Sequence, residues 1–393
     1  MRSIIGVLLL VLVILPDVVL YLEVRKWTQR HWIRRSVLTP SIAFLLGIAF
    51  ILVVIRHSQN ERVLHWFMWF NWAILSIYIP KLLFVIFLLT DKLAARFLRL
   101  RRHGVAKIGA GLALLLFIGF IYGAWIGRFN IQMRHVDIAC DGLPPAFDGV
   151  KIVQLSDIHL GSTGSQTSFW ERAIQLINRE HPDIIVFTGD FVNNFASELT
   201  PPFIASFGQL KAPMGKFSIL GNHDYGDYTQ WTSPSAKRAN LDSIMVRECR
   251  MGFRLLLDEH QFIVNKGDTL VVAGVQNWSK PPFHCYGKLD KAIAGTERFP
   301  FVVLLSHDPN HWMAQVVNYP NIKLTLSGHT HAMQLGINWA GIHWSPAQWL
   351  FKQWEGLYHY AGHYLYVNRG LGYIGVPVRL GMPPEITVIT LHS

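Results

Sequence analysis

The N-terminal third of the chain consists of long apolar stretches. Four of them cover residues 4–22, 38–55, 63–89 and 108–126. A helix of 18 or more apolar residues, rising 1.5 Å per residue, crosses a hydrocarbon core of roughly 30 Å. The first run lacks a small-residue cleavage site, so we expect a retained helix and not a signal peptide. The pattern predicts an all-α transmembrane region with four helices in residues 1–128.

From residue 129 onward the pattern changes to short β-branched runs separated by polar, glycine-rich loops. An amphipathic helix is predicted over 166–179, and strands are predicted over 150–155, 184–188, 216–220, 270–275, 301–305, 323–326, 364–367 and 386–391. Many short strands with few helices between them favour two packed sheets flanked by helices. We therefore expect a second domain over residues 129–393.

Composition and charge support a membrane protein. The chain is 51% hydrophobic and 16% charged, against roughly 25% charged in ordinary soluble chains. Residues 1–128 hold 16 Lys and Arg against 4 Asp and Glu, whereas residues 129–393 hold 20 against 21. The net charge of +11 thus belongs to the apolar third, where it carries topology information. This distribution argues against nucleic acid as a partner.

The basic loops predict an orientation. Lys and Arg concentrate in loops 23–37 and 90–107, while the short loop 56–62 holds only Arg56 and Arg62. Positively charged loops stay in the cytoplasm. We therefore expect the domain after residue 126 on the outer, periplasmic face of a bacterial inner membrane.

Two ionisable residues lie inside the apolar runs, Asp17 in the first and Lys81 in the third. Intramembrane charges are costly and usually face a partner. They form either a structural pair between two helices or part of an ion path, and a single pair favours the structural interpretation.

Residues whose side chains offer a nitrogen or oxygen atom to a metal ion follow the predicted strands. They are Asp157, His159, Asp190, Asn222, His223, Asp224, His307, His329 and His331. Loops leaving the carboxyl ends of strands are where α/β proteins place ligands. His, Asp and Asn without Cys suit Zn, Mn or Fe. Even seven donors from this set would be too many for one ion, and they would fit two divalent metal ions that share a carboxylate, an arrangement that clamps phosphoryl groups.

These blocks carry a resemblance. Asp-x-His (157–159), Gly-Asp (189–190), Gly-Asn-His-Asp (221–224), His307 and Gly-His-x-His (328–331) resemble the five-block signature of calcineurin-like metallophosphoesterases. Asn-Arg-Gly-Leu-Gly (368–372) and Pro-Pro-Glu-Ile-Thr (383–387) resemble its membrane-attached bacterial YkuE/YaeI-like subgroup. The resemblance implies an α+β four-layer αββα sandwich and a metal-dependent phosphoric ester hydrolase.

The resemblance also implies a role for each residue. Asp157, His159 and His331 would hold one ion, Asn222, His307 and His329 the other, and Asp190 would bridge them. His223 would touch the phosphate and protonate the leaving group, and Asp224 would orient His223. Two positions depart from the pattern: Asn193 replaces a second acid, and Ala332 replaces a glycine.

The segment 332–360 is rich in aromatic residues and directly follows the last metal block. Aromatic rings favour the membrane headgroup region, so the segment is either an interfacial flap or a buried lid. Beside a transmembrane region, it favours a phospholipid or phosphoglycolipid as the phosphoester substrate. Arg369 is a candidate phosphate contact, since guanidinium pairs bidentately with phosphate. Its alternative is a structural salt bridge.

Three other functions compete. A pyrophosphohydrolase of a nucleotide-linked lipid, of the UDP-diacylglucosamine type, would act on the cytoplasmic face, against the predicted orientation. A non-catalytic binding module with this fold would typically have lost metal ligands, and none is lost here. A transporter would need more than one intramembrane charged pair.

Overall fold

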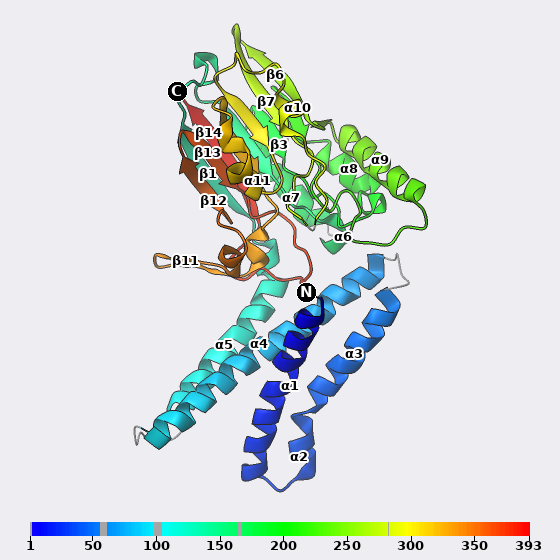
Figure 1. Ribbon diagram of the computed structural model, residues 1–393, viewed down its shortest axis with the longest axis vertical. Helices are drawn as coiled ribbons and strands as arrows, with labels where there is room; N and C mark the ends of the chain where they lie inside the picture. The colour runs from blue at the N-terminus through cyan, green and yellow to red at the C-terminus, as the bar shows by residue number, and fades with distance from the viewer. Residues whose placement is uncertain (1, 56–60, 98–103, 164–166, 282) are drawn as a thin grey trace. The chain divides into compact units, whose positions relative to one another are not determined.

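The computed structural model describes residues 2–55, 61–97, 104–163, 167–281 and 283–393 (Figure 1). The described residues form two compact units. One runs to Trp125 and includes Gly375–Pro377, and the other comprises Ile126–Ile374 and Val378–Ser393. The described residues do not include position 166 of the predicted helix, Arg56 of the short loop, or Arg99, Arg101 and Arg102 of the basic loop 90–107.

The first unit is all-helical. Its helices are α1 (Arg2–Trp27), α2 (His31–Ser36), α3 (Thr39–Ile55), α4 (Glu61–Phe97) and α5 (Gly104–Trp125). Within the described residues, the stretches His31–Phe50, Val63–Phe97 and Gly104–Phe129 are long and apolar enough to cross a membrane. The remaining run, 4–22, lies within α1, whose side chains are described from Val13 onward.

The intramembrane charges form a pair. Lys81 of α4 makes an ion pair with Asp17 of α1, and both side chains are largely shielded, at 14% and 2% exposed. Ser41 of α3 donates a hydrogen bond to the same carboxylate and bonds to the Tyr78 hydroxyl at 2.7 Å. The group ties three helices together, which is the structural interpretation of these two charges.

The second unit contains two six-stranded sheets among the described residues (Figure 1). The first sheet has the order β1-β14-β2-β3-β4-β5, with strands Gln132–Ala139, Glu385–His392, Lys151–Leu155, Ile184–Phe187, Lys216–Ser218 and Arg254–Leu255. The second has the order β12-β13-β9-β8-β7-β6, with strands Gly356–Tyr360, His363–Val367, Ile322–Ser327, Val302–Leu305, Asp268–Gly274 and Glu259–Asn265. A separate hairpin joins β10 (Ile337–Trp339) to β11 (Ile342–Trp344).

The sheets pack face to face because their strands are apolar on both sides. In β3, Ile184 and Val186 join the core between the sheets, whereas Ile185 and Phe187 join the core beneath the helices. Strand β8 alternates likewise between the central core and the outer core of the second sheet. Since successive side chains of a strand point to opposite faces, the central strands of each sheet are buried on both faces.

Helices cover the outer face of each sheet. The described helices of this unit are α6 (Leu160–Thr163), α7 (Thr167–Arg179), α8 (Pro201–Phe207), α9 (Pro234–Arg250), α10 (Leu289–Ile293) and α11 (Asn310–Ala314). Residues of α7, α8 and α9 share a core with the first sheet, and residues of α10 and α11 share one with the second. The predicted four-layer αββα sandwich is confirmed.

Candidate metal centre

The predicted donors converge because their strands are parallel neighbours. β2, β3 and β4 pair in parallel, as do β8 and β9. The carboxyl ends of parallel strands meet at one sheet edge, so the loops that follow them meet as well. All predicted donors lie in these five loops. Within the described residues, two sets of buried side chains bring their ligating atoms within 4.8 Å of one another there, and they are Asp157, His159 and His331, and Asp157, Asp190 and His307.

The first group contains Asp157, His159 and His331, all buried. The two imidazole Nε2 atoms lie 3.1 Å apart, and His331 Nε2 lies 3.2 Å from Asp157 Oδ1. A divalent ion bonded at roughly 2.1 Å separates neighbouring ligand atoms by roughly 3.0–3.4 Å. Two of the three distances in this group fit a bound ion, and the third, 3.9 Å between His159 Nε2 and Asp157 Oδ1, is longer.

Three further donors form a second group around His307, and they are Asn222, His307 and His329. Asn222 Oδ1 lies 3.0 Å from His307 Nε2 and 2.9 Å from His329 Nδ1. The two imidazole nitrogens are themselves 3.2 Å apart. This triangle is tighter than the first, and its sides are close to the separation expected around one ion.

Asp190 joins the two groups. Its Oδ2 atom lies 3.5 Å from His159 Nε2 in the first group and 3.2 Å from His307 Nε2 in the second. Its other oxygen, Oδ1, accepts the His223 amide at 2.8 Å. One carboxylate oxygen therefore faces both groups, as a bridging ligand must.

The hydrogen bonds around the second group leave its lone pairs facing inward. His307 Nδ1 bonds to the Thr188 carbonyl at 2.7 Å, so that nitrogen carries the proton and Nε2 presents a lone pair. Asn222 donates its amide to the Tyr228 hydroxyl at 2.8 Å, which turns Oδ1 inward. Converging acceptors repel one another unless a cation lies among them, so these residues fit a metal ion.

The same surroundings govern protonation. Burial alone would raise the pKa of Asp190, but the adjacent His307 and His223 hold it well below its ordinary value. Burial opposes protonation of His307, yet the charge of Asp190 and the bond to it raise the pKa of His307 to about 10. The centre attracts positive charge, whether a proton or a metal ion.

The ligating loops hold strained backbone. Five of the donors have a positive φ, from 45° to 73°, where side chains other than glycine are uncommon; they are Asp157, His159, Asp190, His329 and His331. Such residues cost on the order of 1–3 kcal/mol each and cluster at functional sites. Ala332, where the family often has glycine, also has a positive φ, of 48°.

Two glycines allow the loops to approach. A Cβ on Gly221 would overlap the Asp190 carboxylate, and one on Gly328 would overlap Ser156 and the Asp157 carboxylate. The Gly-Asn-His-Asp and Gly-His-x-His blocks thus begin with glycine because a larger residue would overlap the neighbouring carboxylate.

His223 lies beside the centre, and the structure corrects how it is oriented. Its Nδ1 bonds to the Asn193 carbonyl at 2.8 Å, and its ring stacks on Tyr228 at 4.3 Å. Asp224, expected to orient it, instead accepts the amides of Asp190 and Gly221, each at 2.8 Å, and of Val192 at 3.3 Å. A carboxylate engaged by three amides positions the ligand loops and not the imidazole.

Arg369, the predicted phosphate contact, is engaged by carboxylates. Its side chain is fully buried, and its Nε lies 2.6 Å from Glu385 Oε2 and 3.3 Å from Glu355 Oε2. Both carboxylates contact Nε, while the terminal nitrogens lie 3.9 Å from Met382 Sδ and 3.4 Å from Gln132 Oε1. These contacts favour the structural salt bridge over the phosphate contact.

Several residues that position the metal-binding loops could not be predicted from the sequence. Arg379 is buried and donates to the carbonyls of Arg369, Gly370 and Gly372, which fixes the loop beside His331. Tyr228 holds the Asn222 amide and stacks on His223. Nothing in the spacing of these residues indicates such contacts, because they depend on how the loops fold.

Comparison with known proteins agrees with this geometry. Residues 150–333 match the family described as "Calcineurin-like phosphoesterase", and residues 1–128 match "Probable Calcineurin-like phosphoesterase, transmembrane domain". The chain is 32% identical to the "Uncharacterized metallophosphoesterase YkuE" of Bacillus subtilis, over 70% of this chain and 90% of that one. It therefore belongs to the calcineurin-like phosphoesterases and is a membrane protein.

Two further relatives are named for a transmembrane region and for a pyrophosphatase activity. A "Transmembrane protein with metallophosphoesterase domain" of Danio rerio is 28% identical over 84% of this chain and 74% of that one. The "UDP-2,3-diacylglucosamine pyrophosphatase LpxG" of Chlamydia trachomatis is 27% identical over 72% of this chain and 96% of that one. Phosphoester hydrolysis by a metal-dependent enzyme is the activity that these relationships support.

Proposed function

We propose that this protein uses two divalent ions, Mn, Zn or Fe, to hydrolyse a lipid-borne phosphoester at the outer face of a bacterial inner membrane. The observation that carries the two-ion assignment is the position of Asp190 Oδ2, within 3.5 Å of a donor from each group. A carboxylate shared between two sets of three donors is the arrangement of two-metal hydrolases.

Each side chain then has a role. Asp157, His159 and His331 hold one ion, Asn222, His307 and His329 the other, and Asp190 both. The bound ions supply Lewis acidity and lower the pKa of water. His223 gives a proton to the leaving oxygen from Nε2, since its Nδ1 is fixed by the Asn193 carbonyl.

Two substitutions separate these roles. His223→Ala leaves the metal donors intact, so we expect both ions to remain while kcat falls about 100- to 10,000-fold, as for the loss of a general acid. Asp190→Ala removes the shared ligand and is expected to lose both ions. Elemental analysis and turnover of each purified variant check this. An unchanged rate in His223→Ala would contradict the acid assignment.

The lipid part of the proposal is supported by apolar side chains exposed after the last metal block. In the β10–β11 hairpin and the turn that follows, Trp339 is 77% exposed, Trp349 72% and Leu350 68%. Within the same segment, Trp354 is buried, and Phe351 packs against the His329 ring at 5.5 Å between centroids. The segment combines a buried base beside the centre with an exposed apolar tip, which favours the interfacial flap over the buried lid.

The double variant Trp339→Ala/Trp349→Ala tests the flap. With Mn²⁺, we expect it to lose about tenfold or more of its activity on phosphatidic acid or phosphatidylglycerol phosphate in vesicles, because it loses anchoring area. Hydrolysis of soluble p-nitrophenyl phosphoesters should stay unchanged. Val264→Ala, at another exposed apolar position, is the matched control. Equal loss on both substrates, or activity on soluble esters alone, would overturn the lipid proposal.

A second candidate is hydrolysis of a nucleotide-linked lipid, which the LpxG relative favours. The same assay with UDP-diacylglucosamine distinguishes the two, since a pyrophosphohydrolase would release UMP. A reporter fused at the C-terminus adds an independent test. Activity of a periplasmic reporter supports the outer face, and activity of a cytoplasmic reporter favours this second candidate.

A further inference from the structure

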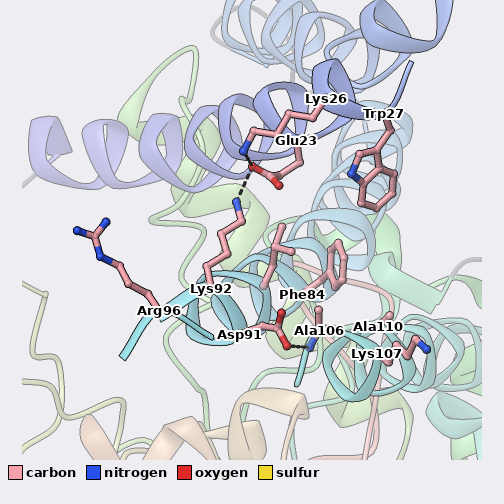
Figure 2. A pocket seen from close by; sticks show the side chains of 11 residues that line it. Glu23, Lys26, Trp27, Phe84, Asp91, Lys92, Arg96, Ala106, Lys107 and Ala110 are labelled. Atoms are coloured by element: carbon pink, nitrogen blue, oxygen red, sulfur yellow. Dashed lines mark hydrogen bonds and ion pairs between the residues drawn. The ribbon is translucent and has the colours of Figure 1, made fainter. Parts of the chain in front are cut away.

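The helical unit contains a cavity that the catalytic centre does not use. Its volume is about 940 Å³, within the range of ligand sites, and helices α1, α4 and α5 line it (Figure 2). Its walls combine two kinds of residue. The apolar ones include Trp27, Phe84, Leu88 and Ala110, and the basic ones are Lys26, Lys92, Arg96 and Lys107.

The acidic residues of the cavity are already engaged. Glu23 pairs with Lys26 at 2.8 Å and with Lys92 at 2.5 Å (Figure 2). Asp91 accepts the amides of Val105 and Ala106 at 3.0 and 3.3 Å, at the beginning of α5. Both carboxylates therefore have structural partners.

The cations exceed the anions. Of the described residues, no carboxylate lies within ion-pair distance of Arg96 or Lys107, and both side chains are exposed at the cavity. The lining holds four Lys or Arg against two acids. The charge of the cavity is complementary to an anion.

The apolar lining distinguishes the anion. Trp27 ends α1, and Phe84 and Leu88 continue the lining along α4 toward the middle of an apolar helix. An aromatic ring at a helix end beside lysine and arginine is typical of the membrane–water interface. A soluble anion would leave these apolar side chains without a partner, whereas an acyl chain would cover them.

We propose that this cavity binds one anionic phospholipid, with its phosphate between Arg96 and Lys107 and an acyl chain along Phe84 and Leu88. Basic pockets between transmembrane helices are suited to anionic headgroups. The site is separate from the catalytic centre in sequence, since its lining residues lie between Glu23 and Ala110 and the metal donors lie between Asp157 and His331. The binding does not depend on the proposed hydrolysis.

Native mass spectrometry of the full-length protein tests the site. Wild type in detergent is titrated with phosphatidylglycerol or with phosphatidylcholine of the same acyl chains. We expect one retained phosphatidylglycerol and no retained phosphatidylcholine. Arg96→Gln/Lys107→Gln should weaken that binding roughly thirtyfold, from the loss of two cations near the headgroup. Arg30→Gln/Arg35→Gln removes as much charge from the neighbouring loop and helix and should bind as wild type does.

One further variant and one competition experiment distinguish lipid binding from the binding of a soluble phosphate. Ala110→Trp keeps every charge but fills the apolar wall, and it should also lose the lipid while retaining the thermal stability of wild type. Excess glycerol 3-phosphate should not displace the lipid; displacement would show that the ligand is a soluble phosphate. Equal retention of both lipids, or equal loss in the control double variant, would overturn the proposal.

Discussion

At the scale of single residues, the metal-binding residues could be predicted from the sequence better than the residues that contact Arg369. The seven metal-binding candidates are His, Asp and Asn residues that each follow a predicted strand. Such a set is typical of a metal site, so its chemistry could be predicted. Arg369 could not be assigned, because phosphate and carboxylate attract a guanidinium equally. Only the fold shows that Glu355 and Glu385 surround it.

Arg369→Leu tests the structural role of that ion pair. Removing Arg369 leaves the two buried carboxylates with the more distant Arg134, at 3.7 Å from Glu355 and 3.6 Å from Glu385, so we expect the free energy of unfolding of the catalytic unit to fall by at most about 3–5 kcal/mol. Thermal unfolding measures the loss. The exposed pair Arg238–Asp242, 3.0 Å apart, supplies the control, and Arg238→Leu should cost less than about 1 kcal/mol. A raised KM at unchanged stability would instead restore the substrate contact.

His311 gives the catalytic unit a pH-dependent stability. It is buried between Ser306 and Gln315 and stacks on Trp278. Burial lowers its pKa to about 4, although Gln315 and Asp308 oppose the shift. In the unfolded chain its pKa is about 6.5. The unfolded state therefore binds the extra proton first, and stability is lost as pH falls from about 6.5 to 4.

The expected loss is on the order of 3 kcal/mol at pH 4. The free energy of unfolding, measured between pH 7 and pH 4, should fall more steeply with pH in wild type than in His311→Gln. The difference in slope corresponds to the uptake of up to one extra proton on unfolding. His181→Gln, at an exposed position, should leave the wild-type slope unchanged. Parallel slopes for wild type and His311→Gln would rule out this origin.

At the scale of elements, prediction succeeded where a strand is apolar and short. β2, β3, β8 and β9 lie within a residue or two of their predicted positions because both of their faces are buried. The edge strand β6 was missed, since Glu259, Gln261 and other polar residues interrupt its pattern. Edge strands need fewer apolar residues.

Helix α9 was also missed, although its beginning carries a signal. Ser233 caps the helix by accepting the Ala236 amide at 3.1 Å, and Pro234 occupies the first turn. Ser followed by Pro is typical of a helix start. Its core-facing apolar residues, Leu241, Ile244 and Met245, begin only near the middle of the helix and make a short stripe, about two turns after that signal.

The loop after β9 could not be predicted at all. His331, Ala332, Met333 and Gln334 all have a positive φ, from 47° to 58°. Local sequence favours no such run, since each residue of this kind costs roughly 1–2 kcal/mol. The surrounding contacts, among them the bond from Ser345 to the Ala332 carbonyl at 2.6 Å, must supply the compensation.

Gly328→Ala tests the close approach of this loop. The added methyl group would overlap the Asp157 carboxylate, so we expect the protein to lose the ion held by Asp157, and most of its turnover. Gly295→Ala is a control that separates crowding from strain. Its φ is 84° but its Cβ would meet open space, so stability should fall by about 1 kcal/mol with the metal content unchanged. Full metal occupancy in Gly328→Ala would contradict the packing argument.

At the scale of the whole molecule, the division of charge and hydropathy predicted two regions of different character. The apolar, basic third forms helices, and the electrically balanced remainder forms the sandwich. What the sequence could not indicate is the cavity among α1, α4 and α5, because it depends on the packing of helices that are each apolar around most of their circumference.

The position of β14 has a consequence for how the sandwich is assembled. Residues 385–392 lie between β1 and β2, and among the described strands β1 has no other neighbour in its sheet. A ribosome must therefore finish residues 385–392 before β1 finds its place. A premature stop codon ahead of Glu385 would leave two open strand edges, and such a fragment is expected to aggregate or be degraded.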